Sequence, residues 1–348
     1  MLDQDTQDLV RDAARQWVVN EHPVEPDHHT ARAGARDRWL AMAELGWAGI
    51  AVDEANGGLG LGVSGLAVLA EELGRELVPT PLISSGLLAP QVLASRPELL
   101  AQVIAGTAIV ALVLDKAPQA RNATVAERVD AGWHISGQAR FVLDGADADW
   151  LIVAAGVPAD LFLIPRERCA MVALDTVDGR SMAHATFDVR VAAEALLCPG
   201  QGVAERLGDL ARIGLAAEML GAAARGLEII VDFLKTRRQF GSPIGAFQAL
   251  QHRAAEMLIA LELARASVEQ AARGADGGED IRAAAAQSKY MANRAVHLVG
   301  SEIVQMHGGM GMTAEHVAGR YLKWARVSEQ LFGNASDLAR RYADACRF

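Results

Sequence analysis

The chain has 348 residues, of which 51% are hydrophobic and 22% charged, with a net charge of −10. This length allows two or three domains, and the acidic balance argues against a general binder of nucleic acid or anionic membranes. No apolar run is long enough to span a bilayer, and the start of the chain lacks a secretory signal pattern. The cysteines Cys169, Cys198 and Cys346 are far apart, which favours a reducing compartment and a cytoplasmic protein.

Helical periodicity predicts that residues 1–105 form an N-terminal helical domain. Leu9, Ala13 and Trp17 recur at helical spacing, and the stretches RDRWLAMAELG and GLAVLAEELGREL repeat the pattern. Residues 106–200 instead carry short β-rich runs, such as AIVALVLD, WLIVAAG and ATFDVRV, separated by Gly, Pro and Asp. This change predicts a middle β-domain, built as an antiparallel sheet or a small barrel.

Long helical segments return in residues 201–348. Apolar residues recur every three or four positions from Leu210 to Leu234. Further segments cover 247–273, 281–305 and 314–331, and a short helix is expected near the C-terminus. Four long helices with short connections predict a C-terminal four-helix bundle. The expected fold class is therefore α+β and mostly α.

An irregular stretch, TRRQFGSPIGAFQALQHRAAEM, interrupts the bundle between its first two helices. Arg237 and Arg238 follow a helix end, where cations are favoured, so a solvated cap is the simplest interpretation. Phe240, however, is apolar in a turn that Gly and Pro make tight. Because a guanidinium suits phosphate, and an aromatic ring with the nearby Gln248 amide suits a planar heterocycle, the stretch indicates half of a nucleotide site.

A second cluster, QMHGGMGM, ends the third bundle helix. One glycine would be enough for a helix C-cap, whereas Gly308 and Gly309 together allow close approach of a ligand and let backbone N–H groups cradle phosphate. His307 and His316 lack the carboxylate or cysteine spacing that would complete a metal site. We therefore expect a phosphate-binding backbone and no metal.

These two clusters resemble the acyl-CoA dehydrogenase family, and the stretches LGWAGIAVDEANGGLGLG and GWHISGQARFVLDGADADWLIVAA are similar to its N-terminal and middle domains. The resemblance runs in order over nearly the whole chain. It implies an FAD-dependent oxidoreductase that converts an acyl-CoA thioester to its trans-2-enoyl form. A carboxylate removes the α-proton while the β-hydrogen leaves as hydride. The resemblance also implies dimers or dimers of dimers in which each FAD spans two subunits.

By the same resemblance, one set of residues belongs to the part that holds the pyrophosphate and adenosine of a neighbouring subunit's FAD. The set is Arg237, Phe240, Phe247, Gln248, Gln305, Met306, His307, Gly308 and Gly309.

The sequence departs from the family where the flavin ring and the base are expected. Residues 111–120 lack the family's Thr-Glu-Pro and Gly-Ser-Asp runs. The flavin-facing Trp and Thr positions carry Phe141 and Leu143, and leucine offers no hydrogen bond. The family's two positions for the catalytic Glu carry Ala211 and Phe332, which cannot accept the weakly acidic α-proton.

Glu218 is the candidate replacement base. It lies seven residues beyond Ala211, on the same face of a helix, and its apolar neighbours would raise its pKa. A structural buried Glu is the alternative interpretation. The uneven losses favour a subunit of a heteromeric acyl-CoA dehydrogenase. A self-sufficient enzyme with a relocated base, a homo-oligomer, and a catalytically silent structural or regulatory homologue stay open.

Overall fold

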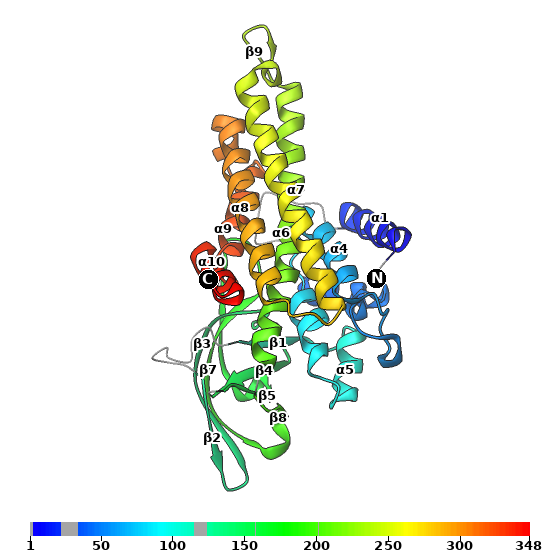
Figure 1. The fold of residues 1–348 in the computed structure, drawn as a ribbon, viewed down its shortest axis with the longest axis vertical. Coiled ribbons are helices and arrows are strands. Elements are labelled where there is room, and N and C mark those ends of the chain that lie inside the picture. Colours follow the sequence, from blue (N-terminus) through cyan, green and yellow to red (C-terminus); the bar gives the residue numbers. More distant parts are fainter. Residues whose placement is uncertain (1–2, 22–33, 115–123, 157, 201) are drawn as a thin grey trace. The chain divides into compact units, whose positions relative to one another are not determined.

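The computed structural model describes residues 3–21, 34–114, 124–156, 158–200 and 202–348 (Figure 1). Its contacts divide the chain into two compact units. The helical unit comprises Met1–Ala31, Val63–Val78 and Arg212–Phe348, and the sheet unit comprises Arg32–Gly62 and Pro79–Ala211.

Long α-helices build the helical unit, and in Figure 1 α6, α7 and α8 run side by side. Helix α8 packs against α7, α9 and α10. The core of the helical unit includes residues that are nearly inaccessible to solvent, among them Leu220, Ile230, Val299, Ile303 and Trp324. The helices are α1 (Gln4–Glu21), α4 (Gly62–Arg75), α6 (Val203–Thr236), α7 (Gln248–Asp276), α8 (Arg282–His307), α9 (Ala318–Ser328) and α10 (Ala335–Cys346).

Helices α4 and α6 cross with their backbones in direct contact. A Cβ added to Gly74 would lie 1.9 Å from the Glu218 carbonyl oxygen, and one added to Gly221 would lie 1.8 Å from the Glu71 carbonyl oxygen. Atoms cannot approach so closely, so each position requires glycine. The two glycines therefore fix the distance between the helix that carries the candidate Glu218 and the N-terminal part of the unit.

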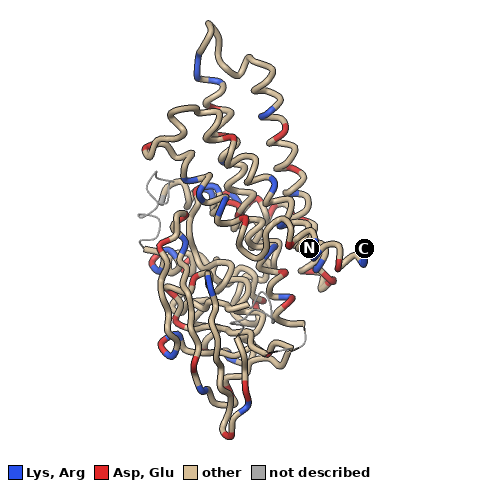
Figure 2. The backbone as a smooth tube through the Cα atoms, turned by 90° about the vertical axis from the view of Figure 1, so that its left-hand side faces the viewer, with Lys and Arg blue, Asp and Glu red and all other residues tan. Residues whose placement is uncertain are grey.

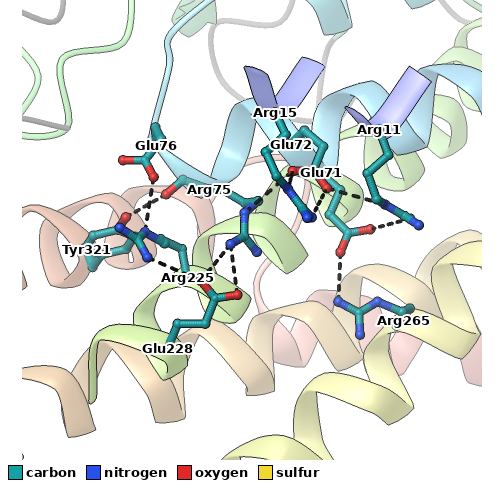
Figure 3. A network of polar contacts seen from close by, with 10 residues as sticks. All are labelled: Arg11, Arg15, Glu71, Glu72, Arg75, Glu76, Arg225, Glu228, Arg265 and Tyr321. Carbon is teal, nitrogen blue, oxygen red and sulfur yellow. Dashed lines mark hydrogen bonds and ion pairs between the residues drawn. The ribbon is translucent and has the colours of Figure 1, made fainter. Parts of the chain in front are cut away.

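A network of charged side chains joins α1, α4, α6, α7 and α9 (Figure 3). At its centre the Glu72 carboxylate, whose side chain is 1% exposed, accepts hydrogen bonds from Nε and Nη2 of Arg15 at 3.1 and 2.9 Å. It also pairs with Arg11 at 3.4 Å and with Arg75 at 3.5 Å. Several guanidinium groups thus compensate for the desolvation of one buried carboxylate.

The network continues through Arg75, which donates two hydrogen bonds to Glu228 at 2.8 and 2.6 Å. Burial alone would raise the pKa of Glu228, but the hydrogen bonds and charges of Arg75 and Arg225 outweigh it and hold that pKa below its usual value. The Tyr321 hydroxyl donates to the Arg75 carbonyl oxygen at 2.6 Å. Burial raises the pKa of Tyr321, so this phenol stays neutral.

Two four-stranded sheets form the centre of the sheet unit. One has the strand order β1-β4-β5-β8 and the other the order β2-β3-β7-β6. Strand β1 runs parallel to β4, with Val110 opposite Trp150, so the first sheet is mixed, whereas the pairs of the second are antiparallel. The strands are β1 (Val110–Val113), β2 (Val125–Val129), β3 (Gly132–Leu143), β4 (Trp150–Ala155), β5 (Asp160–Pro165), β6 (Ala170–Leu174), β7 (Met182–Ala192) and β8 (Leu196–Cys198).

Short helices complete the sheet unit: α3 (Ala35–Glu44), α5 (Pro97–Ile104) and the π-helix η3 (Leu82–Leu88). The π-helix is fully buried, and the Ser85 hydroxyl accepts from the Val110 N–H at 2.9 Å and donates to its carbonyl oxygen at 3.1 Å. These bonds fix the π-helix against the start of β1.

The predicted fold class is confirmed: helices precede and follow a central pair of sheets. The boundaries at residues 105 and 200 stay predictions. Of the expected stretch at 111–120, residues 115–120 lie outside the described part of the chain. Within the described part, no helix is long and apolar enough to cross a membrane.

Candidate functional site

A short hairpin joins α6 to α7 at one end of the bundle (Figure 1). Its strands are β9 (Arg238–Gln239) and β10 (Ser242–Pro243). The Arg237 N–H donates to the Phe233 carbonyl oxygen, and the Ile244 N–H to that of Arg237, each at 2.8 Å. The loop consists of Phe240 and Gly241, with φ values of +53° and +80°. Two positive φ values are typical of a type I′ turn, which usually takes Asn, Asp or Gly.

Phe240 is therefore an unusual residue for its position. Left-handed backbone costs an ordinary L-residue about 1–2 kcal/mol, and no burial compensates here because Phe240 is 92% exposed. Its ring meets that of Phe247 edge to face, at a centroid distance of 6.1 Å. A bulky residue held exposed at a strained position indicates a functional contact.

Arg237, Gln248 and Gln305 are exposed beside this hairpin and at the end of α8. In Figure 2, which colours the backbone by residue type, Lys and Arg positions lie at the turn between α6 and α7. The Arg237 guanidinium has no hydrogen bond or ion pair to any residue that the structure describes, whereas Nη2 of Arg238 donates weakly to the Gly241 carbonyl oxygen at 3.4 Å. Arg237 is thus free to bind an anion, and Arg238 takes part in closing the turn.

The glycine cluster opens η8 (Gly308–Met312) directly after α8. Gly308 has φ +60° and ψ −136°, a conformation that only glycine adopts readily. A Cβ added to Gly308 or Gly309 would meet nothing within 4 Å. The backbone here is open to a ligand, as a phosphate cradle requires.

Three neighbouring rings, tilted relative to one another, link the two clusters. The ring of His307 lies 4.3 Å from that of Phe233, at the end of α6, and 4.5 Å from that of His316. Its Nδ1 donates to the Ile303 carbonyl oxygen at 2.6 Å. Burial lowers the pKa of His307, a change that the Ile303 hydrogen bond opposes and the nearby His316 reinforces.

Both His307 and its neighbour Met306 are buried. His307 therefore supports the glycine backbone as a neutral ring. The described residues contain no group of three or more side chains suited to a metal ion.

The flavin-facing positions lie on β3 in the sheet unit. A bulge between Ala139 and Val142 gives Phe141 a φ of +56°, and Phe141 is 58% exposed. Its N–H donates to Nδ1 of His184 at 3.3 Å, and the two rings meet edge to face. Leu143 is half-buried and has no side-chain donor or acceptor for a flavin. The side chains of Phe141 and Leu143 can therefore offer a ligand apolar contact and no hydrogen bond.

The two expected positions for a base carry Ala211 and Phe332, whose side chains accept no proton. Nε of Arg212, the residue after Ala211, donates to the Phe332 carbonyl oxygen at 3.0 Å. Glu218 is half-buried on α6 and lies about 10 Å along the helix axis from Ala211, at 1.5 Å per residue. Its role as base stays a prediction.

The sequence did not reveal the contacts that hold the loop at 329–334, between α9 and α10. Lys289 Nζ donates to the Ser328 carbonyl oxygen and to Asn293 Oδ1, and Asn293 Nδ2 reaches the carbonyl oxygens of Glu329 and Gly333. A signal was present, since Lys289 and Asn293 are four residues apart in an alanine-rich helix and share one face.

Comparison with known proteins gives the family. The sequence matches the acyl-CoA dehydrogenase N-terminal domain over residues 4–98 and the C-terminal domain over residues 199–343. It is 34% identical to acyl-CoA dehydrogenase IpdE2 of Mycobacterium tuberculosis, over 87% of this chain and 84% of that protein.

Solved structures agree with the sequence match. The fold is similar to that of the ChsE4-ChsE5 complex of Mycobacterium tuberculosis (TM-score 0.90, 26% identity, 99% of this chain and 98% of that one). It is also similar to a Tcur3481-Tcur3483 steroid ACAD variant (TM-score 0.88, 28% identity, the same coverage). The chain therefore belongs to the acyl-CoA dehydrogenase family of FAD-dependent oxidoreductases that act on a CH–CH bond.

Proposed function

We propose that this chain is a subunit of a heteromeric acyl-CoA dehydrogenase and completes the FAD site of a partner chain across a subunit interface. In this arrangement it supplies the half-site for the pyrophosphate and adenosine. The partner, an acyl-CoA dehydrogenase-like chain, supplies the groups around the flavin ring and the base. The substrate is an acyl-CoA thioester, which the complex desaturates between its α- and β-carbons.

One contrast carries the proposal. At the α6–α7 hairpin and the end of α8, an uncommitted guanidinium, a strained exposed phenylalanine and an open glycine backbone face solvent. At the flavin-facing and base positions, Leu143, Ala211 and Phe332 offer no hydrogen-bonding or proton-accepting side chain. A homomeric enzyme needs both sets, whereas a subunit that serves a partner needs only the first.

The residues of the first set have distinct tasks. Arg237 would neutralise the pyrophosphate, the N–H groups of Gly308 and Gly309 would donate to its oxygens, and the ring of Phe240 would lie against the adenosine. Phe247, Gln248 and Gln305 line the same end of the bundle. FAD, when bound, accepts the hydride that leaves the β-carbon of the acyl group. This chain's own contribution is to bind and orient the dinucleotide.

The similar structures support a heteromer, because ChsE4-ChsE5 and Tcur3481-Tcur3483 are each named as pairs of chains. The second is named as a steroid ACAD, so a ring-containing acyl-CoA is the first substrate to test. The proposal includes a cytoplasmic location, which agrees with the free thiols of Cys169, Cys198 and Cys346.

The test compares Arg237→Ala with Arg238→Ala in the assembled complex. Loss of a charge-assisted phosphate contact costs about 1.5–3 kcal/mol, so Arg237→Ala should weaken FAD binding at least tenfold by fluorescence titration. Arg238→Ala removes the same charge from the same turn and should change FAD affinity by less than about threefold. Equal effects of the two variants would contradict a specific contact by Arg237.

Glu218→Gln, together with Arg237→Ala, separates the alternatives. If Glu218 were the base of a self-sufficient enzyme, Glu218→Gln would abolish turnover and leave FAD bound. If the chain were a silent scaffold, Arg237→Ala would leave the flavin content of the complex unchanged. Under the proposed function, Glu218→Gln retains turnover and Arg237→Ala loses flavin.

A further inference from the structure

A cavity of about 530 Å³ lies in the sheet unit, at the start of β4 and the end of β5. It is lined by residues 146–150, residues 165–167 and Arg36, which is near the start of α3. None of these residues belongs to the site described above. The volume is in the range of small-molecule sites, so the chemistry of the lining residues indicates what the cavity can bind.

Two of the charged residues in the lining hold the cavity together. The Arg36 guanidinium donates to both carboxylate oxygens of Asp149, from Nη1 at 3.1 Å and from Nη2 at 2.9 Å, and Nη2 also donates to the Asp147 carbonyl oxygen at 2.9 Å. Asp149 Oδ2 accepts a further hydrogen bond from the Ile109 N–H at 2.8 Å. Because the charges of Arg36 and Asp149 compensate each other, the pair has a structural role and leaves ligand recognition to other groups.

The two strand ends around the cavity are fixed as well. Trp150 lies opposite Pro165 in the pairing of β4 with β5, and the Arg166 N–H donates to the Asp149 carbonyl oxygen at 3.0 Å. The short helix η5 (Arg166–Arg168) follows directly. A ligand would therefore meet a preformed site, which lowers the entropic cost of binding.

Three other charges in the lining are uncommitted. The side chains of Asp147, Arg166 and Glu167 have no hydrogen bond or ion pair to any residue that the structure describes. Asp147 and Arg166 are half-buried, whereas Glu167 is exposed. Within the described part of the chain, Nε of Arg166 is buried without an acceptor, and Asp147 acts on Arg38 through its charge.

A half-buried charge is stabilised by a counter-charge. Asp147 and Arg166 are opposite in sign and line one cavity, yet they do not pair with each other. A ligand that carries both an ammonium group and a carboxylate would compensate the two side chains together.

We propose that this cavity is a binding site for a free α-amino acid with a basic side chain. The α-carboxylate pairs with Arg166 and the α-ammonium group with Asp147. The side-chain cation is attracted by Glu167 and by the ring of Trp150, which is half-buried in the same lining. The uncommitted groups are two carboxylates and one guanidinium, and lysine or arginine carries their complement, two cations and one carboxylate. The inference goes beyond the proposed function and does not depend on it.

The test follows the indole N–H signal of Trp150 by NMR in the full chain, which contains ¹⁵N-labelled tryptophan and is assigned with Trp150→Phe. L-lysine is compared with cadaverine, which lacks the carboxylate, and with L-norleucine, which lacks the side-chain cation. Cadaverine also represents a lone basic side chain, as another protein would present it. We expect a saturable shift with L-lysine. Cadaverine should bind at least about tenfold more weakly, because it loses a charge-assisted hydrogen bond, and L-norleucine at least about threefold more weakly.

Two variants assign the roles, and two others are their matched controls. Arg166→Gln should weaken L-lysine at least about tenfold and leave cadaverine within about twofold, whereas Asp147→Asn should weaken both. Arg168, the control for Arg166, is exposed in the same short helix and donates to the Arg190 carbonyl oxygen at 2.6 Å. Asp130, the control for Asp147, is exposed in the turn before β3. Arg168→Gln and Asp130→Asn should leave the affinity for L-lysine within about twofold.

Three results would overturn the inference. They are the absence of a saturable shift of Trp150 up to about 10 mM L-lysine, cadaverine that binds as tightly as L-lysine, and a loss with Arg168→Gln equal to that with Arg166→Gln. The second result would indicate a docking site for a basic side chain in place of an amino-acid site. Because no probe contains flavin or an acyl group, failure of the proposed function would leave the result unaffected.

Discussion

Replacing Phe240 by Asn separates stability from function at the hairpin. The type I′ loop favours Asn at this position, whereas Phe240 adopts φ +53° while 92% exposed. The substitution removes the strain and the ring together. It should therefore stabilise the hairpin and weaken the site that the ring serves.

The magnitude follows from two opposing contributions. Relief of the left-handed strain is worth about 1–2 kcal/mol. Loss of the edge-to-face contact with Phe247 costs about 0.5 kcal/mol, the lower limit for such pairs, because both rings are exposed. The hairpin should be stabilised by about 1 kcal/mol, which lowers the population of its locally open state, and with it the amide exchange rate, about fivefold. Stacking of an aromatic ring on a base is worth about 1–3 kcal/mol, so FAD should bind at least fivefold more weakly.

Two assays check these values. Hydrogen exchange of the Ile244 amide, whose N–H closes the hairpin onto Arg237, measures opening in the isolated chain. Fluorescence titration of the complex measures FAD affinity. Phe348→Asn is the control for loss of an exposed ring, since Phe348 is 93% exposed at the C-terminus. Faster exchange with unchanged FAD affinity would refute the reasoning on both counts.

Three other predictions concern the framework. Gly74→Ala should lower the free energy of unfolding, measured by urea titration, by at least about 2 kcal/mol, because its Cβ would meet the Glu218 carbonyl oxygen at 1.9 Å. Gly319→Ala is the control: nothing lies within 4 Å of its Cβ, so it should be neutral or stabilising in the same titration. Glu72→Gln should destabilise by about 1–3 kcal/mol, because it leaves Arg11, Arg15 and Arg75 without their buried counter-charge; salt that fully restores the loss would contradict this. Burial lowers the pKa of His307, so its contribution to stability is fully present above about pH 6.5 and is lost as the pH falls through the folded-state pKa. His307→Phe should therefore make the free energy of unfolding less dependent on pH between pH 7.5 and 5.5. An unchanged slope of that free energy against pH would contradict a buried neutral ring.

Helical periodicity carried most of the prediction of the fold. The apolar repeat from Leu210 to Leu234 lies within α6 (Val203–Thr236), and the segment expected over 281–305 is α8 (Arg282–His307). A long apolar stripe becomes buried only if the helix packs along its whole length. The parallel pairing of β1 with β4 could not be predicted. The partner of a strand is determined by tertiary packing when the two strands are far apart in sequence. The residue pattern of one strand does not show whether its neighbour runs parallel or antiparallel to it.

The candidate site was predictable only in part. The residue types of the hairpin and the glycine cluster indicated phosphate binding, and the structure brings the two together through the contact of Phe233 with His307. The strained backbone of Phe240 and Phe332 could not be read from sequence, because neither residue favours positive φ. Such conformations follow from contacts that form only in the folded chain, such as that of Arg212 with the Phe332 carbonyl oxygen.

The central claim is that this chain completes a flavin site without being able to hold FAD by itself. The most direct test is the molar ratio of FAD to protein, by absorbance, for the chain purified alone and with its partner. The account predicts no retained flavin and no turnover for the lone chain, and one FAD per pair of different chains in an active complex. Stoichiometric FAD with full acyl-CoA turnover from the lone chain would contradict it.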